Sequence, residues 1–205
     1  MILSDEEKKL IAYHEAGHTL ASLFTEKSDP IHKVTIIPRG ASLGLTQQLP
    51  LDDKRTYSKK YLEARLVVLL GGRAAEELKF NTVSTGAGND LQNASEISRK
   101  MICEWGMSDS LGAVTLERDT DGIFLGKHLA KEREYSEETA RQVDLEIKRF
   151  VEKAHNTAKD IIKKNKTKLD EIADALLERE VLTGEEVKEI VYGSKKNRKS
   201  NKRSN

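Results

Sequence analysis

The sequence predicts a mainly α fold: a helical array with a small two-stranded β-ribbon, followed by a C-terminal helical bundle. Apolar residues recur at helical spacing over most of the 205 residues, and only two short stretches have the composition of strands. Helix N-terminal signals of the form Ser/Thr-x-x-Glu begin at Ser4 and Thr183. A hydrophobic fraction of 37% beside a charged fraction of 34% indicates a soluble, highly charged globular protein.

The first helix is expected from the capping box Ser4-x-x-Glu7 to about Glu26. Its broad apolar face consists of Leu10, Ile11, Tyr13, Ala16, Gly17, Leu20, Ala21 and Phe24. A glycine inside a helix costs about 1 kcal/mol relative to alanine. Gly17 is therefore either simply tolerated or compensated by the close approach of another backbone or side chain.

Two strands are expected next, at Val34–Ile37 and at Leu43–Leu49, and prolines follow both of them. A ribbon of two strands leaves an edge open, and an open edge can accept an extended peptide. The second strand is thus a candidate substrate shelf, and a plain surface hairpin is the alternative. The shelf residues are Gly44, Leu45, Thr46, Gln47 and Gln48.

The remaining helices follow from apolar periodicity and terminal signals. They are expected over about 57–80, 90–105, 136–164, 166–179 and 183–192. Gly71-Gly72, in the middle of the first of these, indicates tight packing or a local kink. Residues 107–135 are less regular, and Ile123–Gly126 is expected to form a short strand or a packed loop.

The charge distribution separates the C-terminal end from the rest of the chain. Residues 194–205 carry six Lys or Arg and no acidic residue, although the formal net charge of the whole chain is only +1. We expect 194–205 to be a disordered basic tail, with a nucleic-acid or lipid contact as the alternative. The remainder is mildly acidic, so we expect no nucleic-acid partner.

The sequence contains no segment that predicts membrane insertion or export. No apolar run reaches the ~18 residues that a membrane helix requires, and Met1–Leu3 is followed at once by the polar segment Ser4–Glu7. Cys103 is the only cysteine, which excludes an intrachain disulfide and a cysteine-rich zinc site. Any zinc site in these residues must therefore use histidines and carboxylates.

His14-Glu15-Ala16-Gly17-His18 carries the chemistry of the chain. Residues i and i+4 lie on one face of a helix, so His14 and His18 can direct two imidazole nitrogens to one zinc ion. Glu15 is rotated off that line and can contact a water on the metal, as the general base of a zinc protease does. The alternative is an ordinary helix with two histidines.

A catalytic zinc ion needs a third protein ligand and one open position. The metzincin pattern would place Gly at position 21 and His at position 24, but the chain has Ala21 and Phe24. Three carboxylates remain as candidates: Glu76 and Glu77 on a downstream helix, and Asp90 at the start of the next. Asp90 could equally be a capping aspartate that the helix dipole favours.

Five segments together resemble the peptidase domain of the FtsH ATP-dependent zinc proteases. They are Ala12–His18, Lys33–Gly40, Leu70–Glu77, Thr85–Ala87 with Asn89–Leu91, and Trp105–Ser108, in the order of the family. The resemblance extends from about Leu3 to Val191. It implies that His14, His18 and Asp90 bind one Zn²⁺ per subunit and that Glu15 is the catalytic base.

The resemblance also implies a larger protein around this chain. Members of this family carry an N-terminal membrane anchor and an AAA ATPase module ahead of the peptidase, and they form homohexameric rings. The 205 residues contain no phosphate-binding loop, so ATP would act only through that module. We expect one metallopeptidase domain over 1–193, with the zinc site in a first helical half (about 1–106) and none in the second (about 107–193).

The expected function is a zinc endopeptidase that degrades unfolded or unassembled proteins, membrane proteins included. The AAA module of the same full-length chain would supply unfolding and translocation. The full-length protein is expected in the bacterial inner membrane, with this domain on the cytoplasmic side and soluble as a fragment. The alternative is a catalytically silent scaffold for assembly or binding, which the intact His14, Glu15, His18 and Asp90 disfavour.

Overall fold

The computed structural model describes residues 3–38, 44–49, 56–116 and 135–193. The predicted mainly α fold is confirmed, with seven α-helices and three strands in these residues. The elements are α1 (Asp5–Phe24), β1 (Ile31–Thr35), β2 (Leu45–Gln48), α2 (Lys59–Leu69), α3 (Gly71–Phe80), the 3-10 turn η1 (Thr85–Ala87), α4 (Gly88–Cys103), α5 (Glu137–Lys164), α6 (Lys166–Arg179), β3 (Val181–Thr183) and α7 (Gly184–Tyr192). The strand or loop expected at Ile123–Gly126 and the tail 194–205 lie outside the described residues.

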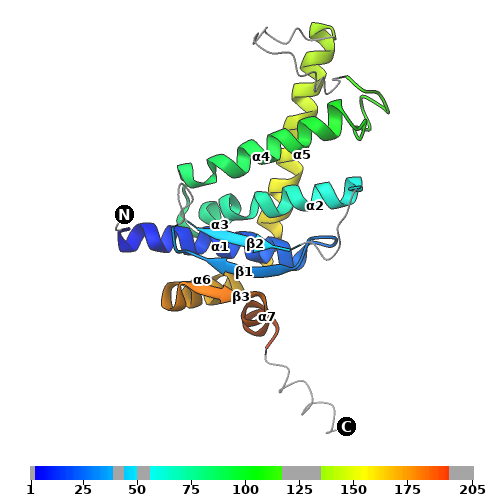
Figure 1. Ribbon diagram of the computed structural model, residues 1–205. Coiled ribbons are helices and arrows are strands. Elements are labelled where there is room, and N and C mark those ends of the chain that lie inside the picture. Colours follow the sequence, from blue (N-terminus) through cyan, green and yellow to red (C-terminus); the bar gives the residue numbers. More distant parts are fainter. Residues whose placement is uncertain (1–2, 39–43, 50–55, 117–134, 194–205) are drawn as a thin grey trace, which may run out of the picture.

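Helix α1 lies in the middle of the molecule, between the helices α2 to α4 and a layer made of the sheet with α6 and α7 (Figure 1). Its predicted capping box is present: the Ser4 hydroxyl accepts from the Glu7 backbone N–H, and the Glu7 carboxylate accepts from the Ser4 N–H at 2.8 Å. Because α1 is covered on both sides, most of its residues from Ile11 to Ser22 are buried.

Two glycines allow α1 and α3 to touch backbone to backbone. A Cβ added to Gly17 would lie 2.3 Å from the Gly71 carbonyl oxygen, and a Cβ added to Gly71 would lie 2.6 Å from the Gly17 carbonyl oxygen. The close approach that could compensate for Gly17 is therefore present. The helix expected over 57–80 is divided, because α2 ends at Leu69 and α3 begins at Gly71.

Replacing Gly17 with alanine is expected to destabilise the protein although alanine favours the helix. The gain in propensity is about 1 kcal/mol. The new Cβ would meet a backbone oxygen and Ala75 Cβ at 2.7 Å, so the two helices must move apart. Overpacking costs about 1–3 kcal/mol, and a rigid backbone neighbour places Gly17→Ala at the high end, for a net loss of about 2 kcal/mol.

Denaturant unfolding of Gly17→Ala beside Gly88→Ala tests this prediction. Gly88 is also helical, but a Cβ there has nothing within 4 Å. Gly88→Ala should therefore unfold at the wild-type midpoint or slightly above it. Equal stability of Gly17→Ala and wild type would show that the α1–α3 contact is not tight.

The sheet has three antiparallel strands in the order β2-β1-β3, so the predicted two-stranded ribbon is wrong by one strand. The additional strand, β3, lies between α6 and α7 and pairs Lys33 with Thr183 and Thr35 with Val181. Among the described strands, β3 pairs with the edge of β1 that β2 does not use, and β2 is an outer strand. The first strand also lies earlier than expected, at Ile31–Thr35 instead of Val34–Ile37.

Helix α5 ties the second half of the chain to the first. It has 28 residues and packs against α2, α3 and α4. Buried apolar residues before and after position 106, such as Leu66, Met101 and Ile162, belong to one core cluster. None of the helices in the described residues is long and apolar enough to cross a bilayer.

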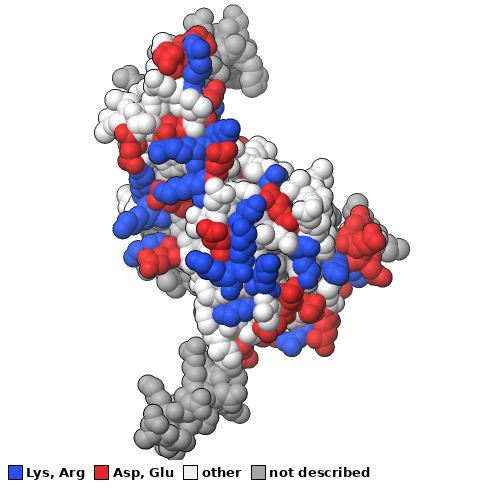
Figure 2. Space-filling model, turned by 180° about the vertical axis from the view of Figure 1, so that it is seen from behind, with Lys and Arg blue, Asp and Glu red and all other residues white. Residues whose placement is uncertain are grey.

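Ion pairs supplement these contacts at the surface. Lys153 of α5 lies 3.2 Å from Glu63 of α2, and Lys159 of α5 lies 3.1 Å from Glu77 of α3. Lys and Arg side chains are mixed with Asp and Glu side chains over the face seen from behind (Figure 2). Partly exposed pairs of this kind contribute only about 1 kcal/mol or less each, so the apolar core carries most of the stability.

Candidate metal centre

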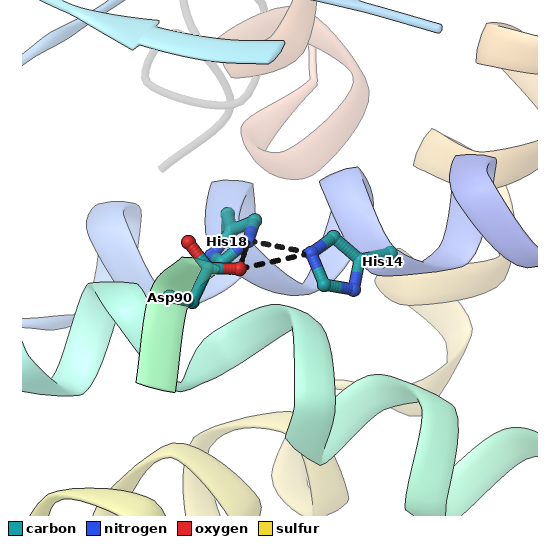
Figure 3. Close-up of side chains that lie close together, drawn as sticks. All are labelled: His14, His18 and Asp90. Carbon is teal, nitrogen blue, oxygen red and sulfur yellow. Dashed lines mark hydrogen bonds and ion pairs between the residues drawn. The ribbon is translucent and has the colours of Figure 1, made fainter. Parts of the chain in front are cut away.

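Three side chains from two helices converge at one point. His14 and His18 project from α1, one helical turn apart, and Asp90 projects from the first turn of α4 (Figure 3). The His14 Nε2 and His18 Nε2 atoms are 2.9 Å apart. Asp90 Oδ2 lies 3.2 Å from His14 Nε2 and 3.3 Å from His18 Nε2. In the described residues, these three form the cluster with the spacing of metal ligands.

The second nitrogen of each ring determines what the first can do. His18 Nδ1 lies 2.7 Å from the Val68 carbonyl oxygen, and His14 Nδ1 lies 2.7 Å from Glu76 Oε1. A carbonyl and an ionised carboxylate only accept hydrogen bonds, so both Nδ1 atoms donate. In the neutral rings both Nε2 atoms therefore carry lone pairs, and these point towards each other and towards Asp90.

A metal cation fits this arrangement. Ligand atoms about 2.0–2.1 Å from a tetrahedral ion are roughly 3.3 Å apart, close to the separations in the cluster. Burial alone would lower the pKa of His14, but hydrogen bonds to Asp90 and Glu76 outweigh it and raise the pKa to about 9. Burial would raise the pKa of Asp90, but in the metal-free site hydrogen bonds and charge interactions with the protonated form of the neighbouring imidazoles hold that pKa well below its usual value. The site thus stabilises positive charge.

Glu76 and Glu77, the other candidates for a third ligand, lie elsewhere. Glu76 is buried and contacts His14 on Nδ1, the ring nitrogen that faces away from the cluster. It also accepts from the Ser84 backbone N–H at 2.7 Å. Glu77 pairs with Arg73 at 3.0 Å and with Lys159 on α5. Glu76 therefore orients a histidine, as carboxylates beside metal-binding histidines commonly do.

Local backbone structure brings His14 and Asp90 to this point. A Cβ added to Gly72 of α3 would lie 2.5 Å from His14 Nε2, so only glycine lets the ring lie against α3. The glycine-rich segment before Asp90 forms η1, in which the Ser84 hydroxyl accepts from the Gly86 N–H. Asp90 then stands in the first turn of α4, where the helix dipole favours a carboxylate.

Glu15 lies beside the cluster, on the side of α1 that faces the sheet. Its side chain is buried, and its Oε2 accepts a hydrogen bond of 2.6 Å from the Thr46 hydroxyl of β2. Although sequence reasoning assigned Thr46 only to a substrate shelf, its hydroxyl contacts the expected catalytic base. The sequence gives no signal of this contact, because Thr46 and Glu15 belong to different elements and no spacing rule relates them.

The sequence as a whole matches one family of peptidases. A sequence model described as peptidase family M41 matches residues 1–190. The chain belongs to peptidase family M41. Proteins similar in sequence to this M41 chain include the ATP-dependent zinc metalloprotease FtsH 4 of Sorangium cellulosum (strain So ce56), which is 51% identical over 195 residues. The resemblance to the FtsH proteases is thus confirmed.

Two further relatives give the same result. The ATP-dependent zinc metalloprotease FtsH of Acidobacterium capsulatum is 47% identical over 193 residues, and that of Magnetococcus marinus is 48% identical over 192 residues. Each of the three alignments covers 94% of the M41 chain. The same alignments cover 30%, 30% and 28% of the relatives, so the chain spans less than a third of their length.

The predicted shelf residues of this M41 chain differ in their surroundings. Leu45 is exposed, whereas the Gln48 side-chain amide donates to the Ser22 hydroxyl and to the Asp29 carbonyl at 2.7 Å. Gln47 lies opposite Lys33 of β1 in the strand register, and Gly44 directly precedes β2. Their contact with a substrate stays a prediction. Most of that contact is expected to come from main-chain hydrogen bonds of β2 and not from these side chains.

Proposed function

We propose that this chain is a zinc-dependent endopeptidase that cleaves unfolded polypeptides. The observation that carries the proposal is the convergence of His14 Nε2, His18 Nε2 and Asp90 Oδ2 within 3.3 Å of one another, with Glu15 next to His14 in the same helix. These three residues would hold one zinc ion per chain. Membership of a peptidase family and similarity to proteins named zinc metalloproteases support the same function.

Each residue has a separate task in the proposed reaction. A zinc ion held by His14, His18 and Asp90 would act as a Lewis acid, which would lower the pKa of a bound water and polarise the scissile carbonyl. Glu15 accepts the proton of the attacking water and passes it to the leaving amine. Glu76 and the Val68 carbonyl keep the two imidazole rings in the tautomer that leaves Nε2 free to bind.

The substrate lies extended along the open edge of β2. In the order β2-β1-β3, β1 covers one edge of β2, and the other edge can take a further strand. Main-chain hydrogen bonds would hold such a peptide, so the cleavage would tolerate many sequences. The proximity of β2 to Glu15, through Thr46, supports this placement.

The activity of the whole protein is a broader proposal, because the chain spans less than a third of its relatives. These relatives are named ATP-dependent zinc metalloproteases. By this resemblance, an AAA module of the full-length chain unfolds substrates, membrane proteins among them, in a homohexamer. The full-length protein would be anchored in the bacterial inner membrane, with this domain on the cytoplasmic side and no nucleic-acid partner.

Removal of the metal is the direct test of the proposed function. A chelator followed by dialysis should abolish hydrolysis of an internally quenched, unstructured peptide by this chain. One equivalent of Zn²⁺ should restore the rate, and Mg²⁺ should not, because imidazole nitrogens suit zinc better than magnesium. Undiminished hydrolysis by the metal-free chain would contradict the proposal.

A further inference from the structure

We propose that Thr46, together with Gly44, positions the Glu15 carboxylate for proton transfer. This inference rests on the proposed peptidase function and adds a positioning residue to it. The role differs from that of a substrate contact, because Thr46 acts through Glu15 and not on the peptide. One strand, β2, would then both receive the substrate and hold the base.

The direction of the Thr46 side chain is the first argument. Thr46 is paired with Val34 of β1, so the two side chains lie on the same face of the sheet. Val34 is fully buried, and α1 packs against both strands. A side chain on this face would ordinarily be apolar, whereas Thr46 presents a hydroxyl to α1.

The hydroxyl has a defined partner. Thr46 Oγ1 lies 2.6 Å from Glu15 Oε2 and 3.3 Å from the Glu15 carbonyl oxygen. A hydroxyl donates a single hydrogen bond, so the shorter contact, to the carboxylate, takes the proton. Hydrogen bonds from a hydroxyl to a charged carboxylate are short and roughly twice as strong as neutral ones. This bond fixes the rotamer of Glu15.

Gly44 limits the carboxylate from the other side. A Cβ added to Gly44 would lie 2.5 Å from Glu15 Oε1 and 2.9 Å from Glu15 Cγ. Hence one Glu15 carboxylate oxygen accepts a hydrogen bond from a hydroxyl of β2, and the other lies against the backbone of Gly44, the residue directly before β2. Because the same backbone offers the edge for a peptide, the register of the substrate is set relative to the base.

The variants Thr46→Val and Thr46→Ser separate the hydroxyl from the shape of the side chain. Valine has nearly the same shape but no hydroxyl, and serine keeps the hydroxyl. With the zinc-loaded chain and a quenched unstructured peptide, Thr46→Val should lower kcat about 10–100-fold, as expected for a misplaced catalytic group. KM should stay within about threefold, because the main-chain edge of β2 is retained. Thr46→Ser should recover most of kcat.

Three further measurements keep the result specific. Zinc content should stay at one ion per chain in Thr46→Val, and a crystal structure of that variant should show the Glu15 carboxylate displaced. Gly44→Ala should lower kcat in the same way. Thr157→Val is the matched control, since Thr157 is an exposed threonine of α5 whose hydroxyl donates to the Lys153 carbonyl. Its kcat should equal that of wild type.

Wild-type kcat in Thr46→Val, or equal loss in Thr46→Ser and Thr46→Val, would overturn the positioning role. If Thr46→Val does not fold, the same comparison is made between Thr46→Ala and Thr46→Ser. Glu15→Gln separates this inference from the function on which it rests. An active Glu15→Gln would remove Glu15 as the base and with it the role of Thr46, and hydrolysis by the metal-free chain would contradict the proposed function itself. An inactive Glu15→Gln with a fully active Thr46→Val would remove only the role of Thr46.

Discussion

Replacing Glu15 with glutamine is expected to lower the hydrolysis of an unstructured peptide by about 10²–10⁴-fold, the range of general acid–base catalysis. Glutamine has the same shape, and its amide oxygen can still accept the hydrogen bond from the Thr46 hydroxyl. It cannot accept a proton from the attacking water, however. Zinc should remain bound, because Glu15 is not in the ligand cluster of the described residues. Steady-state kinetics with zinc analysis by atomic absorption measures both effects.

Glu6→Gln provides the matched control for this prediction. Glu6 lies on the same helix, in its exposed first turn, and the substitution changes the charge by the same amount. Its activity and zinc content should equal those of wild type. Wild-type activity in Glu15→Gln would remove Glu15 as the base, and loss of zinc from that variant would point to a role in metal binding.

Asp90→Ala is expected to release the metal. The substitution removes one of three converging ligand atoms and leaves only the two histidines. Loss of an outer-shell partner typically lowers metal affinity about 10–100-fold, and loss of a ligand should exceed that range. Competition with a chromogenic chelator gives the zinc affinity. The zinc affinity of Asp90→Ala should be well below that of Glu76→Ala, because Glu76→Ala loses only the hydrogen bond that orients His14.

Glu77→Ala completes the comparison of the three carboxylates. Glu77 is held by Arg73 and by Lys159 of α5, away from the histidine nitrogens that face Asp90. Zinc affinity should therefore be unchanged. If Asp90→Ala retained zinc and activity while Glu76→Ala or Glu77→Ala lost both, the third ligand would have to be reassigned.

Much of the fold could be predicted because its determinants are local. The capping boxes at Ser4 and Thr183 and the apolar periodicity locate the ends of most helices correctly. Strand β3 was missed because Val181–Thr183 is too short for a period of two to be visible. What makes it a strand is pairing with β1, a partner distant in sequence.

The residues of the candidate site likewise fall into those that a local pattern predicts and those that it does not. The spacing of His14 and His18 defines two ligands within one helix, so a local pattern is sufficient for them. No spacing rule connects Asp90 to them, and only the family resemblance selected it among three carboxylates. The contacts Glu76–His14 and Thr46–Glu15 join side chains on different elements, and they became visible only in the structure.

Strand β3 has a consequence for how a peptide could reach this sheet. Because β3 is already paired with β1, the chain itself occupies the edge on which a foreign strand could otherwise bind far from Glu15. Its own outer edge has only three residues, one fewer than β2. Strand β3 thus blocks the binding of a foreign peptide to this edge of β1. In the proposed binding mode, strand addition would therefore be directed to β2, beside the proposed base Glu15.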